Sequence, residues 1–85
     1  MPLNEQDVDR IAELAALAPS AREAVQSVRT AFPGVTVTRV DAMDMRGENP
    51  VRRLPGRDLF LVDARSHCWS VTADPAAATG VVIAD

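Results

Sequence analysis

The sequence predicts an α+β fold with two layers, in which an N-terminal helical hairpin packs on a mainly antiparallel sheet of three or four strands. Two observations carry this prediction. Apolar residues recur at helical spacing up to residue 32, and from residue 35 they occur in short runs rich in Val, Ile and Leu. The expected order is helix, helix, strand, strand, strand, short helix, strand. We expect residues 1–85 to form a single domain with a thin core.

The first helix is predicted over residues 4–18. Asn4 is a favourable N-cap, and Asp7 stands three positions later, as in a capping box with a shorter acid. Pro19 ends the helix. The apolar stripe along one face consists of Val8, Ile11, Leu14, Ala15, Leu17 and Ala18.

The second helix begins after Ser20, which is an N-cap with Glu23 at the position that completes a capping box. Its apolar stripe consists of Ala21, Val25, Val28 and Phe32. The Pro-Gly pair at 33–34 ends it. Because the connection between the two helices is short, we expect them to pack as a helical hairpin.

Three segments between residues 35 and 72 are predicted to be strands, and the second and third of them are expected to form a hairpin. Residues 35–40 alternate β-branched side chains, and residues 58–64 form a strongly apolar run. After a turn, residues 67–72 are expected to return as the hairpin partner of 58–64. We expect Asp63 to cap that turn by accepting backbone N–H groups.

The C-terminal segment begins with a short helical turn, because Asp74 is a good N-cap and Pro75 suits the first helical position. Gly80 closes the turn, and VVIA forms the last strand. We expect this strand at a sheet edge, where a bare edge could pair with a second molecule.

Residues 41–57 lose all periodicity and are predicted to form a long loop, either functional or locally disordered. The loop holds four arginines, Arg46, Arg52, Arg53 and Arg57. A guanidinium suits both phosphate and carboxylate, so these residues are the candidates for a small-ligand or anion site. The alternative is a solvated loop, since no glycine-rich phosphate cradle is present.

The only histidine, cysteine and tryptophan of the chain are consecutive, at His67, Cys68 and Trp69. On a strand, His67 and Trp69 share one face. If this is the open face of the sheet, the two form a partner-binding patch, with the tryptophan as a hot spot. The alternative is that Trp69 packs on the helical layer at Phe32.

Cys68 would lie on the opposite face of the same strand, out of hydrogen-bond reach of His67. A cysteine nucleophile needs a base within that reach, so we expect no catalytic residues. We interpret Cys68 as a buried or half-buried structural residue. The alternative is a redox-sensing thiol, which requires exposure and a lowered pKa.

Composition and charge exclude several classes of function. The formal net charge is −3 and the pI is near 5.0, which argues against nucleic-acid binding. One His and one Cys cannot build a structural zinc site, and the acids at 41, 44 and 48 do not fit a calcium loop. We therefore expect no metal and no cofactor.

The sequence also bears on the compartment. No apolar run approaches the roughly 20 residues of a membrane span. The acidic N-terminal stretch lacks the basic start and apolar core of a signal peptide, and a single cysteine suits a reducing setting. We expect no membrane partner and a cytoplasmic localisation.

The run RDLFLVDARSHCWSVTADPAAATGVVIA, residues 57–84, resembles the C-terminal half of short bacterial proteins of unknown function, including accessory proteins encoded near nitrogen-fixation genes. The shared pattern is an apolar strand, a turn, an H-C strand, D-P, and A-T-G before a final strand. It covers about a third of the chain. The resemblance implies a bacterial accessory protein rather than a stand-alone enzyme, and it carries over no catalytic or binding residue.

Three hypotheses for the function follow. The first is a non-catalytic accessory or interaction module that binds a protein partner or self-associates. The second is a small-ligand or anion-binding protein that uses the arginine loop. The third is a thiol-based redox protein centred on Cys68.

Overall fold

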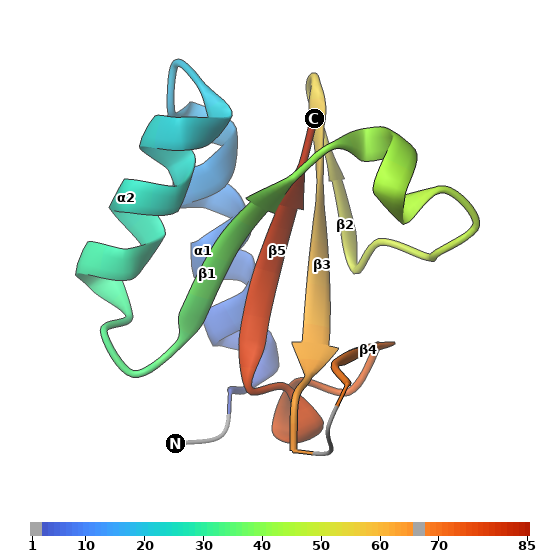
Figure 1. Ribbon diagram of the computed structural model, residues 1–85. Helices are drawn as coiled ribbons and strands as arrows, with labels where there is room; N and C mark the ends of the chain where they lie inside the picture. Colours follow the sequence, from blue (N-terminus) through green and yellow to red (C-terminus); the bar gives the residue numbers. More distant parts are fainter. Residues whose placement is uncertain (1–2, 66–67) are drawn as a thin grey trace.

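The structure is a computed structural model that describes residues 3–65 and 68–85. Two helices precede a five-stranded mixed sheet in this part of the chain (Figure 1). The helices are α1 (Glu5–Leu17) and α2 (Ala21–Ala31). The strands are β1 (Thr36–Val40), β2 (Arg52–Leu54), β3 (Arg57–Asp63), β4 (Ser70–Thr72) and β5 (Gly80–Ala84), with 3₁₀ turns η1 (Ala42–Met45) and η2 (Pro75–Ala77). The predicted α+β class, a helical pair packed on a sheet, is confirmed.

Both helices begin at the predicted caps. The Asn4 side chain accepts the amide N–H of Asp7 at 2.8 Å, and the Asp7 carboxylate accepts the amide N–H of Asn4 at 3.1 Å. The Ser20 hydroxyl accepts the amide N–H of Glu23 at 3.2 Å. These bonds satisfy amide groups that a helix leaves without partners in its first turn.

The sheet has the strand order β1-β5-β3-β2. β1 and β5 are parallel, whereas β3 is antiparallel to all its neighbours. On its side away from β5, β3 pairs first with β2 and then, from Leu61 to Asp63, with β4. The expected hairpin of β3 and β4 is therefore present, with a second strand shorter than predicted.

The prediction of a single loop over residues 41–57 is wrong in detail, because this segment holds η1, β2 and the first residue of β3. It supplies the strand that raises the total above the predicted three or four. β2 and β3 are joined by Pro55 and Gly56, and Gly56 has a φ of +77°, which glycine adopts without steric cost. A three-residue strand is too short to show periodicity, but the Pro-Gly pair was its signal.

The prediction that the last strand lies at a sheet edge is also wrong. β5 lies between β1 and β3, and all five of its residues are buried. An uninterrupted apolar run such as VVIA is typical of a strand covered on both sides.

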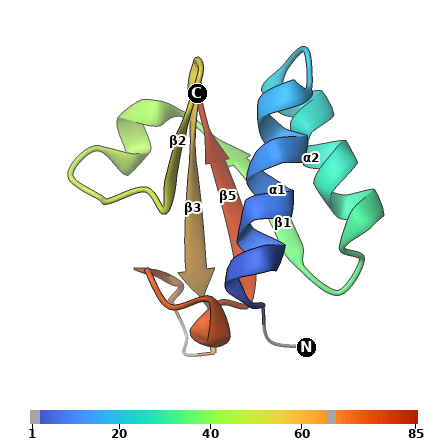
Figure 2. The same ribbon diagram turned by 180° about the vertical axis from the view of Figure 1, so that it is seen from behind.

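The helices cover one face of the sheet, as Figure 2 shows from behind. Odd-numbered residues of β1, β3 and β5 face the helices and form the main core with them, among them Val37, Leu59, Leu61, Val81 and Ile83. Even-numbered residues of the same three strands face the other side, where Phe60, Val62, Val82 and Ala84 form a smaller cluster with Met45 of η1. This second face is where the sheet is incompletely covered.

Candidate functional site

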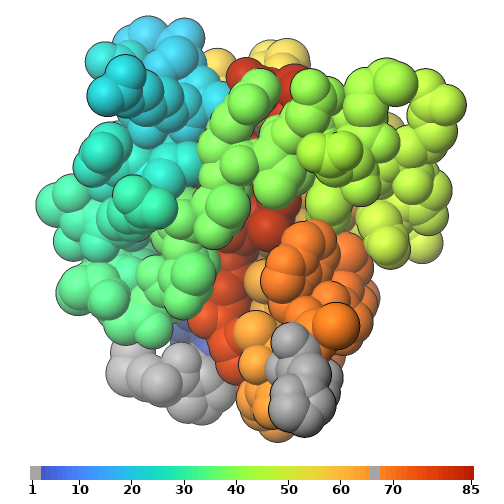
Figure 3. Space-filling model, viewed as in Figure 1, coloured from blue at the N-terminus to red at the C-terminus, as the bar shows by residue number. Residues whose placement is uncertain are grey.

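The helix-free face of the sheet carries an apolar groove. Its floor is β5, visible in Figure 3 between the green atoms of β1 and the orange atoms of the segment after residue 67. Its volume is about 140 Å³. The lining residues are Thr36, Thr38, Val40, Val62, Ala64, Trp69, Thr79, Gly80, Val81 and Val82. We call this hollow the Trp69 groove.

Trp69 lines this groove and is 49 % exposed. Phe32 lies on the other side of the sheet, against the core formed with the helices. Trp69 therefore lies on the open face of the sheet, and it does not pack against Phe32. His67, the residue expected to share the patch, lies outside the described residues.

Gly80 is the reason that the groove reaches down to the backbone of β5. It has no side chain, and a Cβ added there would lie 3.0 Å from the carbonyl oxygen of Thr36 and 3.4 Å from Cγ2 of Val62. Any larger residue would fill this end of the groove and press on the neighbouring strands. Gly80 thus allows a close approach of β1 and β5. The preceding turn ends at Ala78, and Gly80 is the first residue of β5, so the prediction that Gly80 closes the turn is wrong.

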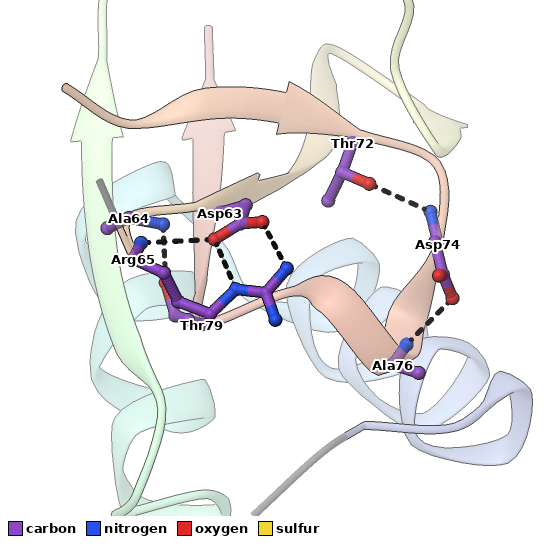
Figure 4. Close-up of polar contacts among 7 residues, drawn as sticks. All are labelled: Asp63, Ala64, Arg65, Thr72, Asp74, Ala76 and Thr79. Atoms are coloured by element: carbon purple, nitrogen blue, oxygen red, sulfur yellow. Dashed lines mark hydrogen bonds and ion pairs between the residues drawn. The ribbon is translucent and has the colours of Figure 1, made fainter.

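Polar contacts hold the chain on both sides of Trp69 (Figure 4). The carboxylate of Asp63 accepts the amide N–H of Arg65 at 3.0 Å and two guanidinium N–H groups at 3.0 and 2.7 Å. The predicted capping of the turn by Asp63 is confirmed. These bonds from Arg65 lower the pKa of Asp63 from 3.8 to about 2.

Two threonine hydroxyl groups accept backbone N–H groups, one at each end of the segment that carries Trp69. The Thr79 hydroxyl accepts the amide N–H of Ala64 at 2.9 Å, and the Thr72 hydroxyl accepts the amide N–H of Asp74 at 3.1 Å. Asp74 in turn caps η2 by accepting the amide N–H of Ala76 at 3.0 Å. The segment that carries Trp69 is therefore anchored at its N-terminal and C-terminal ends.

Cys68 is exposed, so its interpretation as a buried or half-buried structural residue is wrong. It precedes β4, which begins only at Ser70, so strand alternation does not decide its direction. The exposure satisfies one of the two conditions of the redox hypothesis.

Two of the four loop arginines, Arg52 and Arg57, bind groups of α1 and its C-cap. Nη2 of Arg52 contacts Asp9 at 2.9 Å and Glu5 at 3.3 Å, which ties β2 to α1 and raises the pKa of Arg52, chiefly through Asp9. Nη1 of Arg57 donates to the carbonyl oxygens of Ala15 and Ala18. Both guanidinium groups already have partners on α1 or at its C-cap, so an anion would have to compete with these contacts.

The other two, Arg46 and Arg53, are exposed. Nη2 of Arg46 lies 3.5 Å from the sulfur of Met43. None of the four loop arginines lines the Trp69 groove. The arrangement does not bring the predicted anion-binding residues and the hairpin into one site.

A different set of arginines was missed at the level of sequence. Arg22 and Arg29 of α2 and Arg39 of β1 line one shallow hollow, together with Val25 and Gln26. The spacing of Arg22 and Arg29, two helical turns, was the available signal. Arg39 joins them only because β1 packs beside α2.

Within residues 3–65 and 68–85, no helix is long and apolar enough to cross a membrane. The same residues hold no group of three or more His, Cys, Asp or Glu side chains placed to bind a metal ion.

A family model matches residues 7–85, from the first turn of α1 to the end of the chain. The chain belongs to DUF6129, a family of unknown function. No curated protein and no solved structure matches it. The match extends beyond residues 57–84, which carry the resemblance, and includes α2 and all but the first two residues of α1.

Proposed function

We propose that this protein is a non-catalytic interaction module that binds a protein partner through the Trp69 groove. The observation that carries the proposal is the position of Trp69, which is 49 % exposed beside an apolar hollow on the uncovered face of the sheet. Tryptophan is enriched among the residues that contribute most to protein–protein binding. A partner side chain seated against it would complete the second, smaller core.

The size of the groove favours a side chain over a small-molecule ligand. Sites for drug-sized ligands measure about 300–1,000 Å³. The Trp69 groove measures about 140 Å³, which suits one or two apolar side chains. Thr36 and Thr38 at its border offer hydroxyl groups that can satisfy polar atoms at the rim of an interface.

A second candidate is a thiol-based redox protein centred on Cys68. It is favoured by the exposure of this cysteine next to Trp69. In that case the groove would position the thiol of a partner rather than hold the partner by itself. Modification of Cys68 would then change with the redox state of the medium.

We place this module in a bacterial cytoplasm, in an accessory role. The resemblance of residues 57–84 to short proteins encoded near nitrogen-fixation genes supports the bacterial and accessory parts of this proposal. The single cysteine supports a reducing compartment.

The test compares proteins retained from an extract of the native organism by the wild type, by Trp69→Ala and by Leu17→Ala. Leu17 is the matched control, since it is 77 % exposed and lies on α1, on the other side of the sheet. We expect the wild type and the control to retain the same partner, with its stoichiometry measured by sedimentation velocity on the purified complex. Trp69→Ala should lose it.

Retention that is equal for all three proteins would contradict the proposal. So would a wild type that binds nothing and sediments as a monomer at high concentration. Far-ultraviolet circular dichroism of the variants checks that each one is folded.

A further inference from the structure

A second surface lies along β1, at one end of the strand order. β1 pairs with β5, and its other side borders no strand of the described sheet. With five residues it is longer than β2, the three-residue strand at the opposite end. An edge strand presents N–H and C=O groups that an added strand can use.

The hydrogen bonds show which backbone groups of β1 point outward. The carbonyl oxygen of Val40 accepts the amide N–H of Asp85 at 3.3 Å, so even-numbered residues of β1 bond on the side of β5. The carbonyl oxygen of Val37 instead accepts Nη2 of Arg29 at 2.8 Å. The outward backbone groups are therefore those of Val37 and Arg39.

Arg29 closes one half of this edge. Val37 is only 1 % exposed, and its outward carbonyl is occupied by the guanidinium of Arg29. The side chain of Arg39, in contrast, is 50 % exposed. A charged side chain laid over an edge strand is a known protection against unwanted pairing.

The same edge carries a positive charge. Arg22, Arg29 and Arg39 line one hollow between α2 and β1. Asp85 offsets one of them, since its carboxylate lies 2.7 Å from Nε of Arg39. Three guanidinium groups against one carboxylate leave a surface that attracts carboxylates.

We propose that β1 accepts an extended acidic segment of a partner protein as an additional strand. Acidic side chains at alternate positions of that segment lie on the α2 side and bind Arg22, Arg29 and Arg39. When a carboxylate draws the guanidinium of Arg29 away from Val37, the outward carbonyl becomes available to the added strand. A partner without this charge leaves Arg29 in place.

Charge also decides against two other occupants. Symmetric pairing of β1 with β1 of a second copy would bring the arginines of both copies together, and like charges across strands are destabilising. A nucleic acid would satisfy the guanidinium groups but has no peptide groups to continue the ladder of the sheet. The acidic strand satisfies both the charges and the backbone.

The experiment uses a short fluorescent peptide of alternating Glu and Val, with anisotropy as the measure of binding to the full chain. Two control peptides are the Lys-Val version and the Glu-Val version with N-methylated backbone amides on its pairing edge. We expect binding of the unmodified Glu-Val peptide alone, with amide NMR shifts at Val37 and Arg39. Equal binding of the methylated peptide, or of a single-stranded oligonucleotide, would overturn the proposal.

Variants of the protein make the test site-specific. The double variant Arg22→Gln, Arg29→Gln should weaken binding of the Glu-Val peptide by about tenfold or more. The matched control is Arg10→Gln, Arg53→Gln, which removes the same charge from exposed positions elsewhere. An equal loss in the control would show unspecific attraction and overturn the proposal.

This inference is separable from the Trp69 groove. Trp69→Ala should leave binding of the Glu-Val peptide unchanged, since the arginines lie on the α2 side of the sheet. Loss of peptide binding in Trp69→Ala would place the peptide in the groove and overturn the edge proposal. If no partner of the Trp69 groove is found, the binding of the Glu-Val peptide still tests the β1 edge.

Discussion

Nη1 of Arg57, the first residue of β3, lies 2.8 Å from the carbonyl oxygen of Ala15 in the last turn of α1. It also lies 3.0 Å from the carbonyl oxygen of Ala18, the C-cap. α1 has no basic residue in its own last turn, so a residue 42 positions away from Ala15 satisfies carbonyls that the helix leaves without partners. One guanidinium thus joins the two layers.

We expect Arg57→Met to lower the free energy of unfolding by about 1–3 kcal/mol, because two helix carbonyls lose a charged donor in a half-buried site. Urea denaturation measures the change. Arg57→Lys should recover part of it, since an ammonium retains the charge and at least one donor.

The control for Arg57 is Arg53→Met, at an exposed position of the neighbouring strand β2. Its effect should stay within about 0.5 kcal/mol. Equal effects of the two substitutions would contradict the capping role of Arg57.

We expect the carboxyl group of Asp63 to titrate near pH 2 in the folded protein, because Arg65 donates to it with its guanidinium and its amide. A depressed pKa means that the interaction stabilises the turn above pH 3.8, the ordinary value, and that this contribution is lost as the pH falls toward 2. Carbon-detected NMR titration of Asp63 measures the midpoint.

In Arg65→Ala the Asp63 midpoint should rise toward 3.8, because the first and largest cause of its shift is removed. A midpoint that is unchanged in Arg65→Ala would show that Arg65 does not bind Asp63 in solution.

We expect the fluorescence of Trp69, the only tryptophan, to have a red-shifted maximum and to be quenched by iodide, because half of its surface is in contact with solvent. Binding of a partner in the groove should shift the emission to the blue and protect it from iodide. A blue-shifted, protected tryptophan in the isolated protein would contradict the open groove.

We expect Gly80→Ala to destabilise the fold by about 1–3 kcal/mol, the usual cost of overpacking. The added Cβ would meet the Thr36 carbonyl oxygen at 3.0 Å, which β1 can relieve only by moving away from β5. Thermal unfolding measures the effect. Gly34→Ala is the control, since a Cβ there meets nothing within 4 Å and φ is not positive.

Because Cys68 is exposed, we expect iodoacetamide to modify it in the folded protein without prior unfolding. Cys68→Ser should change the free energy of unfolding by less than about 0.5 kcal/mol, as is usual for exposed positions. Mass spectrometry follows the reaction. Strong protection of the native thiol would contradict the exposed position.

Much of the fold could be predicted because its signals are local. The caps at Asn4 and Ser20 and the turn at Asp63 each depend on side chains that bond to backbone within three residues. β2 was not predicted because three residues are too few to show a hydrophobic period. It is a strand because it pairs with β3. The position of β5 in the sheet was predicted wrongly because its parallel neighbour, β1, lies 44 residues earlier in the chain.

The residues of the candidate sites also differ in how far the sequence could predict their surroundings. The unusual residues at 67–69 drew attention to the segment that carries Trp69, but composition did not decide between Phe32 and the open face. The arginines of the loop were conspicuous in the sequence, yet Arg52 and Arg57 are engaged with α1. Arg22, Arg29 and Arg39 were not predicted to share a site, because they belong to two different elements, α2 and β1, and meet only when these elements pack together.

The two helices with their N-caps, the hairpin of β3 and β4, and the α+β class can be read from the chain, since periodicity and capping act over a few residues. The central position of β5, the place of Trp69 over the uncovered face and the closure of the β1 edge by Arg29 appear only in the folded molecule. Strand order and side-chain partners depend on which surfaces exclude water together, and these surfaces join residues far apart in the chain.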